Sequence, residues 1–191
     1  MKSGLAAMYL ALEKLYEDGV TLPGKVVFLA TAGEEVDSCG ARAYLQEKTM
    51  EDVDALVIGE PTNEKIAIGH KGALWLEINV FGKTAHGSMP QFGVNAVRHM
   101  AHIIEWIEEY ALQWKWSQKV LGESSMAVTK IAGGVQTNVI PDFCSLHVDI
   151  RTVPPQRHDE LIAELTQKLN DFTPKYEGLS ISVKPLLDRA A

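Results

Sequence analysis

The sequence predicts an α/β protein in which a partial doubly wound layer is interrupted by a small ferredoxin-like α+β domain. Two short apolar runs, residues 25–33 and 54–59, have the pattern of strands that are buried on both faces of a parallel sheet. From residue 66 onward the pattern changes to the alternation of apolar and polar residues that is typical of half-exposed antiparallel strands. The two patterns therefore predict two domains, with a boundary near residue 65.

The elements predicted over residues 1–65 follow the order helix, strand, helix, strand. Residues 3–18 repeat apolar side chains at spacings of three, four and three, which predicts a helix that ends at Gly19. A second helix is predicted over residues 40–47, between the two buried strands. A doubly wound layer needs more strands than these two, so residues 1–65 are predicted to form only part of such a domain.

Residues 66–184 are predicted to form the small domain, in the order β-α-β-β-α-β. Its strands are predicted at residues 74–81, 125–132, 143–151 and 179–183, and its helices at residues 94–111 and 161–169. This order is typical of a ferredoxin-like unit, in which two helices cover one face of a single sheet. Residues 185–191 are predicted to begin the return to the first domain.

The composition excludes several classes of partner. The 191 residues include 18 Lys and Arg against 25 Asp and Glu, a formal net charge of −7, and nucleic acid is not expected as a partner because phosphate contacts need clustered cations. No apolar run reaches the ~18 residues of a membrane-spanning helix, and the first residues do not resemble a signal peptide. Cys39 and Cys144 lie too far apart for a thiolate zinc site or a disulfide framework. We therefore expect a cytoplasmic protein without a membrane partner.

Three carboxylates follow the two buried strands. Glu34 and Glu35 come directly after the first strand, and Glu60 comes after the second. Open α/β sheets bind ligands past the carboxyl ends of their strands, so these side chains are candidates for a cation site. Two adjacent glutamates ionise together in a partly dry cleft only if a metal neutralises one, which leaves the other available as a base. The alternative is that strand-end glutamates are simply solvated.

Histidines offer a second kind of candidate. His86 lies in a loop, residues 82–90, that is rich in Gly and Pro, and a histidine there can transfer protons or stabilise an oxyanion. An ordinary surface histidine is the alternative. His99 and His102 are three residues apart on a helix and could bind a metal. They share the polar face of that helix, however, so a solvated surface is the favoured interpretation.

Arg151 ends a predicted strand on its polar face. Its guanidinium could hold a substrate carboxylate through two hydrogen bonds, or it could form a surface pair with Asp149. The glycine-rich segment at residues 133–141 lacks the spacing of a phosphate-binding loop and opens a strand and not a helix, so it does not indicate a nucleotide site.

Five segments, taken together, resemble the M20 family of metallopeptidases, which includes acetylornithine deacetylase, succinyl-diaminopimelate desuccinylase, carboxypeptidase G2 and aminoacylase. They are MKSGLAAM, FLATAGEEVDSCGA, VIGEPT, GHKGALWLEINVFGKTAHGSMPQFGVNAV and GGVQTNVIPDFCSLHVDIRTVP. The resemblance covers essentially the whole chain, in order and with family-like spacing. It implies a catalytic domain, partial over residues 1–65, and a lid and dimerisation domain over residues 66–184.

The resemblance also implies the chemistry. Family members bind two zinc ions, with cobalt or manganese as alternative metals, and a glutamate takes the proton of the bridging water that attacks an amide carbonyl. This implies that Glu34 is the general acid/base, that Glu35 is a ligand of one metal, and that Glu60 is a ligand of the other. The expected function is hydrolysis of an amide bond in an N-acyl amino acid or a small peptide.

The small domain would supply further site residues. By resemblance, His86 reaches the active site of the partner subunit in a homodimer and stabilises the tetrahedral oxyanion. Asn138 and Arg151 would contact the substrate carbonyl and carboxylate, and Lys71 in the matching HKG turn would belong to the same pocket.

Only two of the family's five metal ligands match this chain, because the others lie in segments that family members carry before Met1 and after Ala191. We therefore expect the 191-residue chain alone to lack amidase activity and a tight zinc site. The competing hypothesis is a non-catalytic module for dimerisation and substrate gating.

Overall fold

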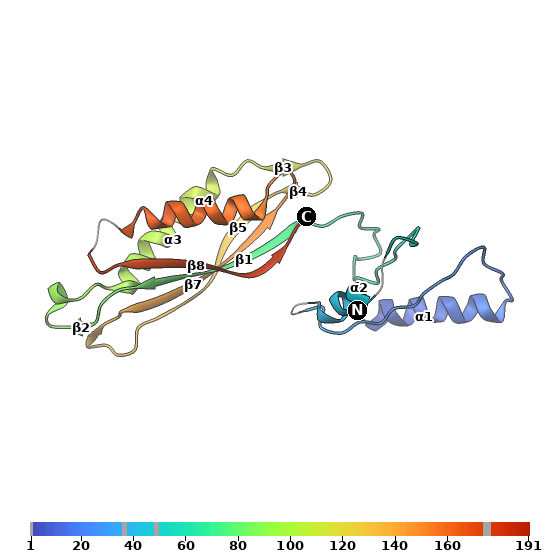
Figure 1. Ribbon diagram of the computed structural model, residues 1–191, viewed down its shortest axis with the longest axis horizontal. Coiled ribbons are helices and arrows are strands. Elements are labelled where there is room, and N and C mark those ends of the chain that lie inside the picture. The colour runs from blue at the N-terminus through green and yellow to red at the C-terminus, as the bar shows by residue number, and fades with distance from the viewer. Residues whose placement is uncertain (1, 36–37, 48–49, 174–176) are drawn as a thin grey trace. The chain divides into compact units, whose positions relative to one another are not determined.

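The computed structural model describes residues 2–35, 38–47, 50–173 and 177–191. The chain forms two compact units (Figure 1), unit 1 over Met1–Ala67 and unit 2 over Ile68–Ala191. Among the described residues, no helix has the length and apolar character needed to cross a membrane.

Unit 1 contains two helices, α1 (Lys2–Glu17) and α2 (Cys39–Glu47), close to the predicted positions. α1 packs against the segments that follow it. The rings of Tyr9 and Phe28 meet edge to face with their centroids 6.3 Å apart. Gly4 lies so close to Gly59 that any Cβ at this position would collide with the Gly59 carbonyl oxygen.

The two strands predicted at residues 25–33 and 54–59 are not formed, and this prediction is wrong. The described residues of unit 1 contain no strand and no buried residue. The apolar side chains of both runs are exposed: Val26, Val27, Phe28, Leu29, Leu56, Val57 and Ile58. A strand of a parallel sheet needs hydrogen-bonded neighbours and cover on both faces, and the described part of unit 1 supplies neither.

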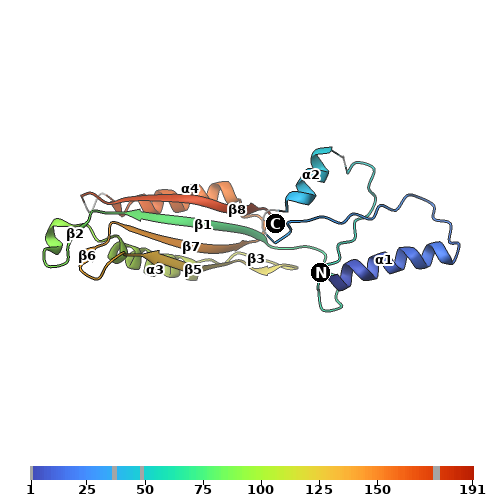
Figure 2. The same cartoon turned by 90° about the horizontal axis from the view of Figure 1, so that it is seen from below.

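Unit 2 is built on a four-stranded sheet in the order β5-β7-β1-β8, with every neighbouring pair antiparallel (Figure 1). Its strands are β1 (Gly72–Phe81), β5 (Ser125–Gly133), β7 (Phe143–Thr152) and β8 (Ser180–Arg189). Two helices, α3 (Ala96–Leu112) and α4 (His158–Asn170), cover one face of this sheet (Figure 2). The expectation of a mixed α/β protein with a sheet is confirmed.

Short elements complete unit 2. Two-residue strands form two small pairs, β2 (Ala85–His86) with β6 (Val139–Ile140), and β3 (Ser117–Gln118) with β4 (Gly122–Glu123). A single 3₁₀ turn covers Pro90–Phe92.

The last strand is longer than the alternation pattern predicts. A strand was expected at residues 179–183, with the chain leaving the domain from residue 185, but β8 continues to Arg189. Residues 184–189 remain in the sheet beside β1. A β-bulge and Pro185 break the regular alternation there, so the continuation has no period-two signal in the sequence.

One hydrophobic core lies between the sheet and the helices of unit 2. Alternate residues of β1 and β7 face it, because successive side chains of a strand point to opposite faces. α3 and α4 contribute residues three or four positions apart. The buried residues of this core include Leu74, Leu76, Ile78, Val80, Met100, Ile103, Ile107, Leu146, Val148, Ile150, Leu161, Leu165 and Leu169. Burial of each such side chain contributes roughly 1.5–3 kcal/mol, so this core is the main source of stability in the unit.

Polar and aromatic contacts fix the two helices. The side chain of Asn95 accepts a hydrogen bond from the Arg98 N–H at 3.0 Å and caps the start of α3. Trp106 stacks on Tyr110 with ring centroids 5.2 Å apart. The Tyr110 hydroxyl donates to Glu164 Oε1 at 2.8 Å, which joins α3 to α4. Burial, with a smaller contribution from Glu164, raises the pKa of Tyr110 to about 12.

Candidate active-site residues

The three carboxylates expected at a metal site lie in unit 1. Glu34 and Glu35 are exposed in a turn, and Glu60 is exposed in a segment without regular structure. Among the described residues, no group of three or more His, Cys, Asp or Glu side chains is placed to hold a metal ion. A zinc site needs three or four protein ligands, so the donors that this part of the chain brings together do not fit a zinc site. The roles of Glu34, Glu35 and Glu60 remain predictions.

His86 lies in the short strand β2 and is exposed. The backbone N–H of Ser88 donates to His86 Nδ1 at 3.2 Å, and the Ser88 hydroxyl oxygen lies 2.8 Å from the same nitrogen. Because Nδ1 accepts a hydrogen bond, the neutral ring carries its proton on Nε2. An N–H of this kind is the donor that an oxyanion requires.

The structure brings Asn138 next to His86. In the β2–β6 pair, His86 lies opposite Val139, and the Gly87 N–H donates to the Asn138 carbonyl oxygen at 2.7 Å. The two residues are 52 positions apart in the sequence, and each lies in a different glycine-containing segment. No sequence pattern predicted their pairing, because two-residue strands have no periodicity to read.

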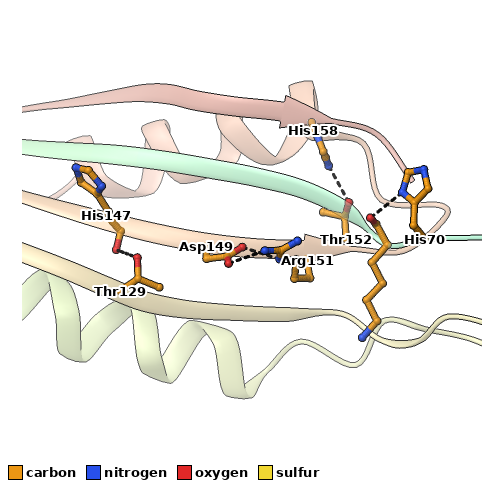
Figure 3. A network of polar contacts seen from close by, with 8 residues as sticks. His70, Thr129, His147, Asp149, Arg151, Thr152 and His158 are labelled. Carbon is orange, nitrogen blue, oxygen red and sulfur yellow. Dashed lines mark hydrogen bonds and ion pairs between the residues drawn. The ribbon is translucent and has the colours of Figure 1, made fainter. Parts of the chain in front are cut away.

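Lys71 and Arg151 lie together at the start of β1. Lys71 directly precedes Gly72, and its ammonium donates to the Glu123 carbonyl oxygen. Arg151 pairs with Ala73 across the β1–β7 ladder. Its Nε lies 2.8 Å from Asp149 Oδ1, and a second nitrogen donates to Oδ2 at 2.9 Å (Figure 3).

The four candidate residues of unit 2 thus fall at opposite ends of its sheet. Lys71 and Arg151 lie at the end where β1 begins, which we call the Gly72 end. His86 and Asn138 lie beyond the other end, which we call the Phe81 end. A ten-residue strand rises about 3.3 Å per residue, so about 30 Å separates the two ends. One copy of unit 2 therefore cannot bring His86 and Arg151 to the same small substrate.

His99 and His102 lie on α3, as the sequence predicts. Burial, and then the neighbouring His102 and Arg98, lower the pKa of His99. His102 Nδ1 lies 3.7 Å from Glu105 Oε2, and His102 is half exposed. With no third metal-binding side chain grouped with them among the described residues, the pair is assigned no metal role.

One partly buried polar cluster, around His158, was not predicted from the sequence. His158, at the start of α4, lies between Thr152 Oγ1, 2.7 Å from its Nε2, and Asp188 Oδ1, 2.5 Å from its Nδ1 (Figure 3 shows the Thr152 contact). The histidine side chain is 8% exposed. A histidine at the first position of a helix was the available signal, but its partners come from β7 and β8 and cannot be inferred locally.

Comparisons with known proteins give the fold and the family. The sequence profile described as a peptidase dimerisation domain, of the M20 type, matches residues 68–177. A probable succinyl-diaminopimelate desuccinylase of Staphylococcus aureus is 30% identical over 205 residues, covering 95% of this chain and 51% of that protein. An acetylornithine deacetylase of Buchnera aphidicola is 31% identical over 155 residues, covering 79% of this chain and 40% of that protein.

A solved structure has a similar fold. The aminopeptidase PepT of Bacillus cereus superposes with a TM-score of 0.64 at 22% identity, covering 100% of this chain and 49% of that chain. The chain spans about half the length of the curated relatives it matches. The profile match covers more than half of the 191 residues. The chain therefore belongs to the M20 peptidase family, and unit 2 carries the dimerisation domain of that family.

Proposed function

We propose that this chain is the central part of an M20 amidohydrolase that acts on an N-acyl amino acid or a small peptide, and that unit 2 is its ferredoxin-like lid and dimerisation domain. The names of the relatives support amide hydrolysis. The sheet order β5-β7-β1-β8 supports the ferredoxin-like assignment, because the two central strands are the first and third of the domain. The observation that carries the proposal is the separation of the candidate residues between the two ends of this sheet.

That separation favours an active site shared between two copies. Lys71 and Arg151 would hold the substrate carboxylate in the site of their own chain. His86 and Asn138, about 30 Å away along β1, would reach the site of the partner, where His86 Nε2–H donates to the oxyanion. Formation of the homodimer is therefore needed for catalysis, because each active site takes residues from both copies.

The dimer surface is proposed at β5 and α3. β5 is an edge strand, and exposed edges need a partner or protection. α3 lies over β5, and along one side it exposes Val97 (37%) and Leu112 (82%). The other edge strand, β8, contains Pro185, which has no N–H to donate. Pairing through β5 would continue the sheet from one copy into the next.

In the complete hydrolase, two metal ions would activate the attacking water. Glu34 is proposed to accept its proton and to return it to the leaving amine, and Glu35 and Glu60 are proposed as ligands of the two metals. Since the described residues do not assemble a metal site, no further step is assigned to this chain. The same observation favours the second candidate function, a non-catalytic dimerisation and gating module.

Sedimentation of the 191-residue chain tests the dimer. We expect a dimer at roughly tens of micromolar, a working concentration suited to an interface of standard size. Ala101 is exposed on α3 beside Val97, and Ala101→Glu should yield a monomer because it buries an unpaired charge. Ala163→Glu, on the exposed face of α4, is the matched control and should leave the dimer intact. A monomeric parent chain, or a dimer that survives Ala101→Glu, would count against this surface.

A further inference from the structure

The face of the sheet that carries no helix contains a hollow of about 360 Å³. All four strands contribute to its lining, which includes Trp75, Thr129, Lys130, His147, Asp149 and Leu186. None of these residues has a role in the proposed hydrolysis. Small-molecule sites hold about 300–1,000 Å³, so the hollow can accept a single ring with a short substituent.

Two β-bulges shape this hollow, one in each edge strand. The register of β5 with β7 shifts between Val128 and Lys130, so that Thr129 is an extra residue. The register of β8 with β1 also shifts, and Leu186 is the extra residue there. Both extra residues line the hollow. Bulges bend a strand and redirect its side chains, and they occur frequently beside binding sites. The shape of the hollow is therefore set by the backbone of the two edge strands.

The hollow combines an apolar surface with a cation. Trp75 and Leu186 are 38% and 42% exposed, although both lie within the sheet. An indole face binds aromatic rings by stacking. Lys130 is exposed at the side of the hollow formed by β5, next to the half-buried His147. An ammonium group binds a carboxylate more strongly than it binds a neutral acceptor.

The neighbouring carboxylates already have partners. Asp149 pairs with Arg151, which donates a hydrogen bond to Oδ2 at 2.9 Å and places Nε at an ion-pair distance of 2.8 Å from Oδ1. Glu77 lies opposite His147, with 3.6 Å between Oε1 and Nε2, and accepts a hydrogen bond from the Asn79 amide at 3.1 Å. The Asn79 hydrogen bond, together with the Lys184 ammonium, lowers the pKa of Glu77 despite the opposing effect of burial.

We propose that this hollow binds a small aromatic carboxylate, with its ring against Trp75 and its carboxylate on the Lys130 ammonium. No carboxylate in the described part of the chain lies within ion-pair distance of Lys130. A neutral ring would gain no charge attraction from this cation, and a cationic ligand would be repelled by it. The site requires only unit 2, so it stands whether or not the chain takes part in amide hydrolysis.

NMR titration of the ¹⁵N-labelled chain with phenylacetate tests this proposal. The four tryptophans give four indole N–H signals, and Trp75→Phe identifies the signal of Trp75. We expect phenylacetate to shift this signal together with the Lys130 amide. Phenylacetamide, which lacks the charge, and acetate, which lacks the ring, should each bind at least about tenfold more weakly, since each loses one of the two contacts.

Two lysine variants test whether the Lys130 ammonium binds the carboxylate of the ligand. Lys130→Gln should weaken phenylacetate binding about tenfold, because it removes a charge-assisted contact. Lys184→Gln is the matched control, since Lys184 lies opposite Glu77 on the same face but outside the lining of the hollow, and it should change the affinity less than about twofold. The proposal is overturned if the Trp75 signal does not shift, if phenylacetamide binds as tightly as phenylacetate, or if the two variants behave alike.

Discussion

His158 Nδ1 lies 2.5 Å from Asp188 Oδ1, and this contact joins the first residue of α4 to the penultimate residue of β8. The other ring nitrogen reaches Thr152 at the end of β7. Gly72 lies directly beneath this cluster, where any Cβ would collide with Thr152 Oγ1. The cluster therefore fixes three strand ends beside Arg151, the residue proposed to bind the substrate carboxylate.

Removal of the histidine should destabilise unit 2. We expect His158→Ala to lower the free energy of unfolding by about 2–3 kcal/mol, because it leaves the buried Thr152 hydroxyl and the Asp188 carboxylate without their partner. Urea unfolding measured by tryptophan fluorescence reports on unit 2 alone, since all four tryptophans lie in it. Arg157→Ala removes only exposed pairs, with Asp159 and Glu160, and should cost less than about 0.5 kcal/mol. Equal losses in the free energy of unfolding for the two variants would contradict the proposed contribution of the cluster to stability.

Tyr110 makes the stability of unit 2 sensitive to strong alkali. Its pKa is raised from 10.0 to about 12 in the folded protein, so the folded state holds the proton more tightly than the unfolded state does. The resulting stabilisation is complete below pH 10 and is lost as the pH rises toward 12. Unfolding curves across this interval should show a smaller loss of stability for Tyr110→Phe than for the parent. Tyr9→Phe, in unit 1, is the control and should leave the pH dependence of tryptophan-monitored unfolding unchanged.

The glutamate roles can be separated in a chimera in which this chain replaces the matching half of the Staphylococcus aureus relative. Glu34→Ala should abolish turnover and leave both metals bound, because it removes a base and not a ligand. Glu35→Ala and Glu60→Ala should each weaken one metal site. Activity assays with metal analysis distinguish the cases. Loss of metal from Glu34→Ala, with retention in Glu35→Ala, would reverse the assignment.

The 191-residue chain alone should bind zinc weakly and should not hydrolyse N-acetylated amino acids. The proposed ligands Glu35 and Glu60 supply one protein ligand for each metal, where three or four are needed. Calorimetric titration with zinc and a hydrolysis assay are the measurements. Submicromolar binding of two zinc ions per chain, or metal-dependent hydrolysis, would mean that further ligands exist in this chain and would exclude the non-catalytic module.

The periodic parts of the fold were predictable and the non-periodic parts were not. The alternation around Leu74 and Leu146, and the helical spacing around Met100 and Leu165, follow from burial on one side of an element. The runs at residues 25–33 and 54–59 have the same apolar character as buried strands but form none, because a strand also depends on neighbours that its own residues do not encode.

In the candidate site, too, the features with a local sequence pattern were predictable and those set by distant strand partners were not. Residue types and loop signals made His86 and Arg151 candidates individually, and their roles stay predictions. Their placement at opposite ends of the sheet follows from strand pairing over long sequence distances, as does the contact between His86 and Asn138. The extra residues Thr129 and Leu186 had no local signal either, because a β-bulge is defined by the partner strand.

Subunit complementation tests most directly whether the two ends of the sheet serve different active sites. In the chimera, His86→Ala and Arg151→Ala should each have low activity as homodimers. After subunit exchange in an equimolar mixture, half of the dimers are mixed, and one site in each combines an intact His86 with an intact Arg151. The account predicts recovery of about a quarter of the parental activity. If the mixture stays as inactive as its components, His86 and Arg151 act in the same chain and the account is contradicted.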